Sequence, residues 1–206
     1  MSGSCCGELM EALRGRRSIR EFDKEPVPGE LVEQLIDAAA WAPSAGNRQD
    51  WRFVVVQSAE VKSAMALAAR QSWDRIIAEN RHLGLAQELA DYAAGFADFG
   101  QAPLVIAVAS ARPNSVQRAL LGELAKSTTG SFASAAMAAQ NLMLAAHALG
   151  LGSCCMTGAL AASKELSEIL GLGARLELVC LIAVGRPRRR PQVPQRKPRS
   201  EIARYL

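Results

Sequence analysis

Apolar and polar residues along the chain follow two patterns, one with the period of a helix and one typical of buried strands. Three runs are continuously apolar and rich in β-branched residues, as expected of strands covered on both faces. They are Trp51 to Gln57, Pro103 to Ser110 and Leu176 to Val184. A fourth, shorter strand is expected over Ser153 to Met156.

Apolar residues spaced three and four positions apart predict helices around these strands. They cover Glu8 to Leu13, Gly29 to Trp41, a segment capped by Ser58 that ends near Ser72, two pieces between Trp73 and Phe99 divided near Gly84, Ser115 to Lys126, Ser131 to Leu149, and Lys164 to Leu170. Pro43 is expected to end the second helix and Gly150 to cap the long one. Because helices exceed strands without strict alternation, the sequence favours an α+β fold.

The chain of 206 residues fits a single domain, 1–206, with an extended, Pro-rich C-terminal arm over 186–206. Residues 186–199 hold six Arg and one Lys without an acid, whereas the rest of the chain has 17 basic and 20 acidic residues. Nucleic-acid-binding proteins usually spread their basic residues over a face of the fold. The concentration of positive charge in the arm is therefore evidence against nucleic-acid binding.

Residues 127–163 lack any charged side chain and approach the length of a membrane span. Gln140, Asn141 and His147 interrupt the run, so we expect a buried helix at a subunit interface and no membrane segment. The N-terminus lacks the pattern of a signal peptide. Five cysteines, with Cys5-Cys6 and Cys154-Cys155 adjacent, fit neither a disulfide framework nor a zinc site, and we expect a reducing cytoplasm.

Motifs of several enzyme classes are absent from the sequence. There is no G-x-S-x-G elbow and no G-x-x-x-x-G-K-[ST] phosphate loop. Gly150-Leu151-Gly152 follows a helix and lacks the third glycine of a dinucleotide fingerprint. Two histidines are too few for a multi-histidine metal site, and no metal is expected.

Polar and basic residues gather in three segments that could bind an anionic ligand. The opening cluster is Arg16, Arg17, Ser18 and Arg20, whose guanidiniums suit a phosphate. If this segment is extended, positions 16, 18 and 20 point to one side. The Asn47 loop is Pro43 to Gln49, and the C-terminal arm carries Arg196-Lys197-Pro198-Arg199. Taken singly, the opening cluster also fits a solvated surface, the Asn47 loop a capping turn, and the basic residues of the arm a solvated tail.

In order and spacing, these segments resemble the FMN-dependent nitroreductase superfamily over most of the chain. The matching pieces are Arg16 to Phe22, Lys24 to Pro28, Pro43 to Trp51 with Phe53 to Val56, Ala102-Pro103, Gln140 to Ser153, Gly185 to Pro187, and the late Arg196-Lys197-Pro198. Asp50 departs from the pattern, which commonly has Pro there. Residues 70–100 match nothing in the family pattern.

The resemblance implies an intertwined homodimer with a mostly antiparallel sheet and two FMN sites, each built from both subunits. Arg16, Arg17, Ser18 and Arg20 would bind the phosphate, ribityl chain and pyrimidine edge, and Arg196, Lys197 and Arg199 would close on the phosphate. Pro43, Ser44, Ala45, Asn47 and Gln49 would approach the ring from the partner chain. The backbone near Thr157 and Gly158 would face flavin N5.

The implied activity is a ping-pong reaction in which NADH or NADPH reduces FMN and a small-molecule acceptor, such as a nitroaromatic or quinone, is then reduced. Chemistry on the flavin needs no protein nucleophile, in agreement with the missing motifs. Other flavin chemistry remains open, namely reductive dehalogenation or the oxygen-dependent flavin breakdown that yields the lower ligand of cobalamin. A non-catalytic FMN-binding protein and a basic-tail nucleic-acid binder also remain. Cys154-Cys155 could be small buried residues or could act with the flavin, whereas Cys5-Cys6 are expected to be exposed near the N-terminus.

Overall fold

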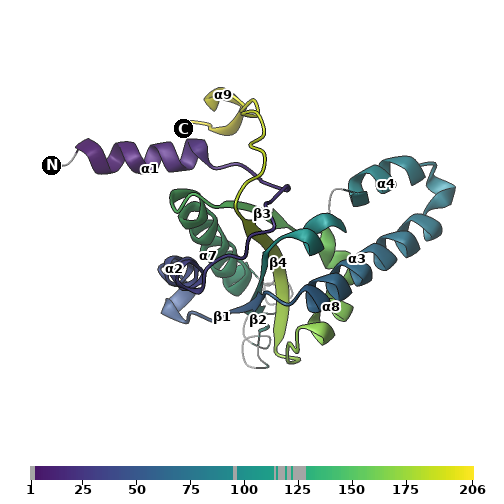
Figure 1. The fold of residues 1–206 in the computed structure, drawn as a ribbon. Coiled ribbons are helices and arrows are strands. Elements are labelled where there is room, and N and C mark those ends of the chain that lie inside the picture. Colours follow the sequence, from purple (N-terminus) through teal and green to yellow (C-terminus); the bar gives the residue numbers. More distant parts are fainter. Residues whose placement is uncertain (1–2, 95–96, 114, 116–118, 120–121, 123–128) are drawn as a thin grey trace.

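The computed structural model describes residues 3–94, 97–113, 115, 119, 122 and 129–206. Its centre is one sheet of four strands, β1 (Trp51–Val56), β2 (Leu104–Ala111), β3 (Gly152–Met156) and β4 (Leu176–Gly185). They lie in the order β1-β2-β4-β3, and every neighbouring pair is antiparallel (Figure 1). This confirms the four predicted strands to within one residue at either end.

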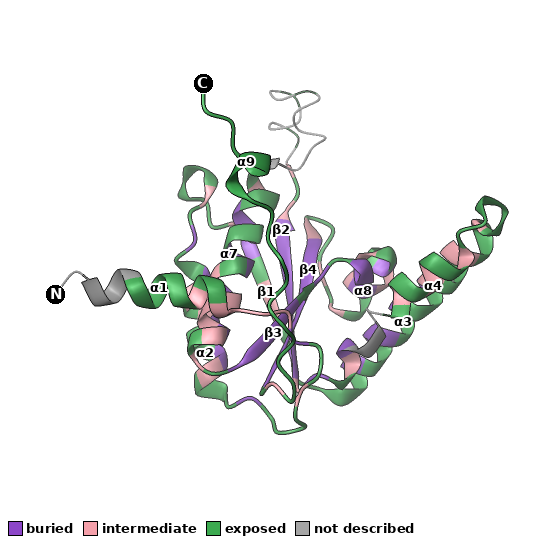
Figure 2. Cartoon of the chain, turned by 90° about the horizontal axis from the view of Figure 1, so that it is seen from above, coloured by how far each residue is buried: buried purple, intermediate pink, exposed green. Residues whose placement is uncertain are grey.

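Helices cover both faces of the sheet, as continuous apolar strands require (Figure 2). In β2, Leu104, Ile106 and Val108 belong to the core under α2 (Gly29–Ala40) and α7 (Thr129–Ala148). Val105 and Ala107 alternate with them and belong to the core on the other face. The opposite core also holds residues of α3 (Ala59–Glu79) and α8 (Ser163–Ile169). The α+β class is therefore confirmed.

The remaining helices lie at the margins of this body. They are α1 (Gly3–Gly15), α4 (Ala86–Ala94), the four-residue α9 (Arg199–Ile202) and the 3₁₀ turns η1 (Ala45–Asn47), η2 (Arg81–Leu83), η3 (Ala97–Gln101) and η4 (Gly158–Ala162). Figures 1 and 2 show α3 and α4 projecting from one side of the sheet and α1 from the other. The predicted helix over Ser115 to Lys126 falls largely outside the described residues.

One predicted helix boundary is wrong: α3 continues through Ser72 without a break. Ser58 caps this helix as expected, since its hydroxyl accepts a hydrogen bond from the Val61 amide at 3.3 Å. Ser72 starts no second helix because its side chain is buried and its hydroxyl accepts a hydrogen bond from Arg75 at 2.8 Å. The division near Gly84 is confirmed, and Gly84 has a φ of +70°.

The uncharged helix α7 ends at Ala148, and Gly150 caps it as predicted. Gly150 has a φ of +76°, and the Leu151 amide donates to the Ala146 carbonyl at 2.8 Å, which closes the last turn. Small residues face α2 and the sheet, whereas Phe132 and Met137 are 42% and 40% exposed. Over the described parts of the chain, no helix combines the length and hydropathy of a membrane span.

A buried lysine joins α3 to the start of β2. Lys62 is 6% exposed, and its ammonium donates to the carbonyls of Ala102 at 2.6 Å and Pro103 at 2.9 Å. Burial lowers the pKa of this side chain. The two carbonyls offset part of the desolvation of the charge, so we assign Lys62 a structural role.

Replacing Lys62 with Met should lower the free energy of unfolding by about 2 kcal/mol, because two carbonyl acceptors lose a charged donor. Urea unfolding followed by circular dichroism measures the effect. Lys164→Met, which alters an exposed lysine, is the matched control and should leave the midpoint unchanged. Equal midpoints for both variants would show that the Lys62 contacts contribute nothing.

Candidate functional site

The opening cluster lies along the margin of the sheet beside β3. After α1, the backbone forms a parallel bridge between Ser18 and Ser153, and the Ile19 amide donates to the Ser153 carbonyl at 3.0 Å. Phe22 then bridges Pro187. The chain therefore carries the arginines across the ends of β3 and β4.

Two paired glycines make room for this segment. Gly152 of β3 lies opposite Gly185 of β4. A Cβ on Gly152 would meet Ile19 at 2.7–2.9 Å, and a Cβ on Gly185 would meet Pro103 at 2.8 Å and Phe22 at 3.1 Å. Only glycine permits this close approach, so the position of the opening cluster depends on both residues.

The members of the opening cluster divide between two hollows. Ser18 and Arg20 line an outer hollow of about 270 Å³ together with Arg189 and Gln192. Arg16 lines a different hollow, because its amide still donates to Ala12 in the last turn of α1, at 3.0 Å. The extended backbone that would bring positions 16, 18 and 20 to one side is therefore not present at Arg16.

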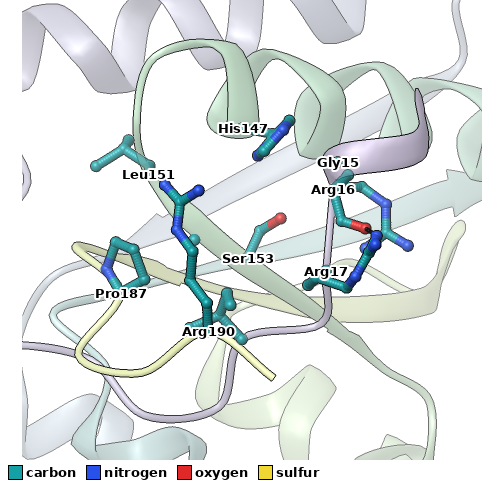
Figure 3. Close-up of a pocket in the computed structure, with 10 residues that line it drawn as sticks. Gly15, Arg16, Arg17, His147, Leu151, Ser153, Pro187 and Arg190 are labelled. Atoms are coloured by element: carbon teal, nitrogen blue, oxygen red, sulfur yellow. Dashed lines mark hydrogen bonds between the residues drawn. The ribbon is translucent and has the colours of Figure 1, made fainter. Parts of the chain in front are cut away.

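The second hollow is strongly basic (Figure 3). We call it the basic hollow; it encloses about 20 Å³ and is lined by Gly15, Arg16, Arg17, Ile19, His147, Leu151, Gly152, Ser153, Pro187 and Arg190. The Ser153 hydroxyl is buried and has no hydrogen-bond partner among the described residues. The hollow has room for about one water molecule, so an anionic group would bind at its mouth, where the guanidiniums suit it.

Arg17 differs from its neighbours because its guanidinium is already engaged. It donates to the carbonyls of Arg14 at 2.6 Å and of Arg16 at 2.7 Å. These carbonyls lie at the end of α1, where helical carbonyls lack partners. Arg17 therefore secures the turn that presents Arg16.

His147 reports on the charge of the basic hollow. Burial lowers the pKa of His147, and the guanidiniums of Arg190, Arg16 and Arg17 lower it further. The unfolded chain thus binds a proton more readily than the folded one. Stability from this group is present above its ordinary pKa of about 6.5 and is lost as the pH falls towards the lowered value.

Adding inorganic phosphate should raise the pKa of His147, because an anion offsets the repulsion from the three arginines. The imidazole signals in NMR spectra, followed over pH with and without phosphate, measure this shift. His82, the other histidine, lies in η2 and is the internal control. Equal movement of both histidines, or of neither, would contradict an anion site in the basic hollow.

The Asn47 loop has an unusual backbone held by its own side chains. Gly46, Asn47 and Gln49 all have positive φ, at 62°, 52° and 50°. The Gln49 amide donates to the Ser44 hydroxyl at 3.1 Å, and the Gln49 side chain donates to Asn47 Oδ1 at 3.1 Å. Such strain in two non-glycine residues often marks a functional loop.

Contacts with the first turns of α7 fix this loop. The Ala45 amide donates to the Ser134 hydroxyl at 3.2 Å, and the Ser131 hydroxyl donates to Asp50 at 2.8 Å. Asp50 also pairs with Arg48 at 3.3 Å. Asp50, the departure from the family pattern, therefore anchors the loop to α7.

One copy of the chain does not bring the Asn47 loop and the opening cluster together. The loop contacts Ser134 near the start of α7, whereas the basic hollow includes His147 at its end. Thirteen residues of helix separate these positions by about 20 Å. The Asn47 loop and the basic hollow therefore lie beside opposite ends of α7.

The turn after β3 is held by the region that the sequence left unassigned. Thr157 is exposed and Gly158 is buried. The Trp73 indole donates to the Gly158 carbonyl at 3.0 Å, and Trp73 meets Tyr92 of α4 edge to face with ring centroids 5.4 Å apart. No sequence pattern links Trp73 to this turn, so the sequence analysis missed its role.

The C-terminal arm contributes its beginning to the site. Arg189 lines the outer hollow and Arg190 the basic hollow, two residues that the sequence analysis did not assign. Arg196, Lys197 and Arg199 are exposed, and the Lys197 ammonium lies 4.0 Å from Glu201. Within the described part of one chain, the arm does not bring these three side chains into either hollow.

Comparison with known proteins agrees with this architecture. The model of the nitroreductase family matches residues 13–186. The chain belongs to the nitroreductase family. A relative named NADH dehydrogenase from Thermus thermophilus is 33% identical over 176 residues, which cover 84% of this chain and 83% of the relative. Family and fold therefore confirm the resemblance inferred from the sequence, and the chain is an oxidoreductase of this family.

Solved structures of the nitroreductase fold superimpose over nearly the whole chain. A BluB-like flavoprotein from Clostridium difficile has a TM-score of 0.83 at 24% identity, covering 96% of this chain and 98% of that one. A nitroreductase with bound FMN from Desulfitobacterium hafniense has a TM-score of 0.74 at 22% identity, covering 97% and 98%. Iodotyrosine deiodinase 1 from Rattus norvegicus is 46% identical over 55 residues, 27% of this chain and 19% of that protein.

Proposed function

We propose that this nitroreductase-family protein is an FMN-dependent oxidoreductase that uses NADH or NADPH to reduce nitroaromatics, quinones or related acceptors. The observation that carries the proposal is the basic hollow, which is lined by Arg16, Arg190 and Ser153, whose buried hydroxyl has no partner among the described residues. Its charge fits the phosphate of FMN. The FMN in the related nitroreductase and the name of the Thermus relative support the cofactor and the electron donor.

Each predicted residue has a defined part in this proposal. Arg16 would bind the phosphate, and Arg17 would hold the turn that positions Arg16. Ser18 and Arg20, in the outer hollow, would face the ribityl chain and the pyrimidine edge. From the arm, Lys197 and Arg199, with Arg196, would close on the phosphate after the arm moves.

When bound, FMN would supply the redox chemistry that connects the nicotinamide donor to the acceptor. The protein provides orientation and electrostatics. Arg20 is a fixed cation that would stabilise negative charge at the pyrimidine edge with little reorganisation. The backbone at Thr157 and Gly158 would orient the ring, and Trp73 positions that backbone through the Gly158 carbonyl.

The same proposal includes a homodimer. The Asn47 loop, with Pro43, Ser44, Ala45, Asn47 and Gln49, would reach the ring from the partner, because it contacts the start of α7 whereas the basic hollow of its own chain lies at the end of that helix. The exposed Phe132 and Met137 of α7 would lie in the interface. We also propose that the protein is cytoplasmic, in keeping with the free thiols of Cys154, Cys155 and Cys180. We propose further that residues 1–206 form a single domain with an extended arm over 186–206.

Anaerobic titration tests the activity. The purified protein should show the absorption of oxidised flavin, which NADH or NADPH should bleach and a nitroaromatic or quinone should restore. Flavin that neither nicotinamide reduces would indicate a non-catalytic FMN-binding protein. Protein that binds no FMN would contradict the proposal.

Removing residues 186–206 separates this proposal from a basic-tail nucleic-acid binder. The deletion takes away Arg189 and Arg190, which line the two hollows, so FMN should be lost. A nucleic-acid binder would instead lose nucleic acid and keep its flavin.

Reductive dehalogenation is a second candidate, favoured by the local identity of 46% with the deiodinase. A halogenated tyrosine should then oxidise the reduced flavin faster than a nitroaromatic of similar size. The comparison needs the same anaerobic protein and a stopped-flow spectrometer. Faster oxidation by the nitroaromatic would favour the main proposal.

A further inference from the structure

Two cysteines on neighbouring strands share one face of the sheet. Cys155 of β3 pairs with Ile182 of β4, and Cys180 lies two residues before Ile182. Side chains two positions apart on a strand point to the same face, so Cys155 and Cys180 are diagonal neighbours. Cys155 is exposed although the rest of β3 is buried, and Cys180 is buried behind it.

The two thiols differ in acidity in a way that favours reaction at Cys155. The neighbouring Cys180 thiol lowers the pKa of Cys155, and the Arg16 guanidinium lowers it further against the effect of burial. The neighbouring Cys155 sulfur, together with burial, raises the pKa of Cys180. An accessible thiol of lowered pKa beside a buried thiol is the arrangement that oxidants attack.

We propose that Cys155 and Cys180 are a redox-sensitive thiol pair that a hydroperoxide oxidises to a disulfide between β3 and β4. The Cys155 thiolate attacks the peroxide, the O–O bond breaks, and the departing alkoxide or hydroxide takes up a proton. Cys155 is then a sulfenic acid. The Cys180 sulfur attacks it, the S–S bond forms, and the lost hydroxyl leaves as water with the Cys180 proton. Two thiols are oxidised while one peroxide is reduced.

Formation of this disulfide requires a local shift of β3. Diagonal neighbours on antiparallel strands have Cα atoms about 7–8 Å apart, slightly beyond the usual span of a disulfide. Because the Thr157–Gly158 turn follows β3 directly, oxidation should move that turn. The thiol chemistry itself does not depend on flavin or on the proposed function.

The test uses the full-length protein as purified, with Cys5 and Cys6 changed to Ser. After treatment with hydrogen peroxide and alkylation of free thiols, non-reducing tryptic digestion should give peptide 127–164 linked to peptide 176–188. The linked mass should be the sum of the two peptides less two hydrogen atoms, plus one alkyl group on Cys154, and dithiothreitol should separate them. Separate peptides after excess peroxide, with 127–164 alkylated at both of its cysteines and 176–188 alkylated at Cys180, would overturn the proposal.

Cys154 is the matched control within the same strand. It lies beside Cys155 but is buried with the opposite core, and burial raises its pKa. Cys154→Ser should keep the linked peptides, and Cys155→Ser should abolish them. In Cys180→Ser, Cys155 should instead accumulate sulfenic acid that dimedone labels. A link that survives Cys155→Ser and disappears in Cys154→Ser would contradict the assignment.

Discussion

Replacing Arg16 with Ala should weaken FMN binding about thirtyfold and leave the protein folded. Arg16 lines the basic hollow, where a charge-assisted contact with the phosphate would be worth on the order of 2 kcal/mol. Arg20→Ala should have a similar effect through the outer hollow. Titration of the apoprotein with FMN, followed by quenching of flavin fluorescence, measures both.

Two controls separate lost binding from lost structure in this experiment. Arg70→Ala removes an exposed guanidinium from α3 and should keep the wild-type affinity. Arg17→Ala removes the donor to the carbonyls of Arg14 and Arg16, so it should lower thermal stability as well as affinity. Wild-type FMN affinity in both Arg16→Ala and Arg20→Ala would refute the placement of the cofactor.

Replacing Gly152 with Ala should both destabilise the fold and release the cofactor. The new Cβ would lie 2.7–2.9 Å from three atoms of Ile19, including its Cβ, so the backbone beside β3 must shift. Crowding of this kind costs about 1–3 kcal/mol. The opening cluster moves with Ile19, so flavin binding should fall more than the loss of stability alone explains.

Gly173→Ala is the matched control, since a Cβ there meets nothing within 4 Å. Urea unfolding and FMN titration of the two variants, made side by side, provide the comparison. If Gly152→Ala matched Gly173→Ala in both measurements, the close approach of Ile19 to β3 would contribute neither to stability nor to FMN binding.

Local pattern predicted most of the fold. The strands could be found because apolar residues such as Leu104, Ile106 and Val105 fill both faces, and Gly150 ends α7 through a backbone angle that glycine favours. The helix boundary predicted near Ser72 was wrong because Ser72 is buried in the core and Arg75 donates a hydrogen bond to its hydroxyl. A sequence shows that a residue is a serine but not which group its hydroxyl bonds in the folded protein.

The candidate site could be predicted only in part, for the same physical reason. The opening cluster and the Asn47 loop are local segments with recognisable composition. The basic hollow, however, joins Arg16 to His147 and Arg190, three residues distant in sequence. Trp73 supports the Gly158 carbonyl from a helix that carries no family pattern. Such contacts arise from tertiary packing, which the spacing of apolar residues in the sequence does not predict.

We propose that FMN lies in a site formed by the opening cluster of one copy and the Asn47 loop of another. The FMN content of mixed dimers tests this arrangement. One copy carries Arg16→Ala and Arg20→Ala; the other carries Asn47→Gly and Gln49→Gly, which remove side chains while glycine keeps the positive φ. Each variant alone should bind no FMN.

In the mixed dimer, purified through a different tag on each copy, one site combines both defects and the other combines both intact segments. We therefore predict one FMN per mixed dimer. An FMN content of zero in the mixed dimer, as in each variant alone, would contradict a site shared between two copies.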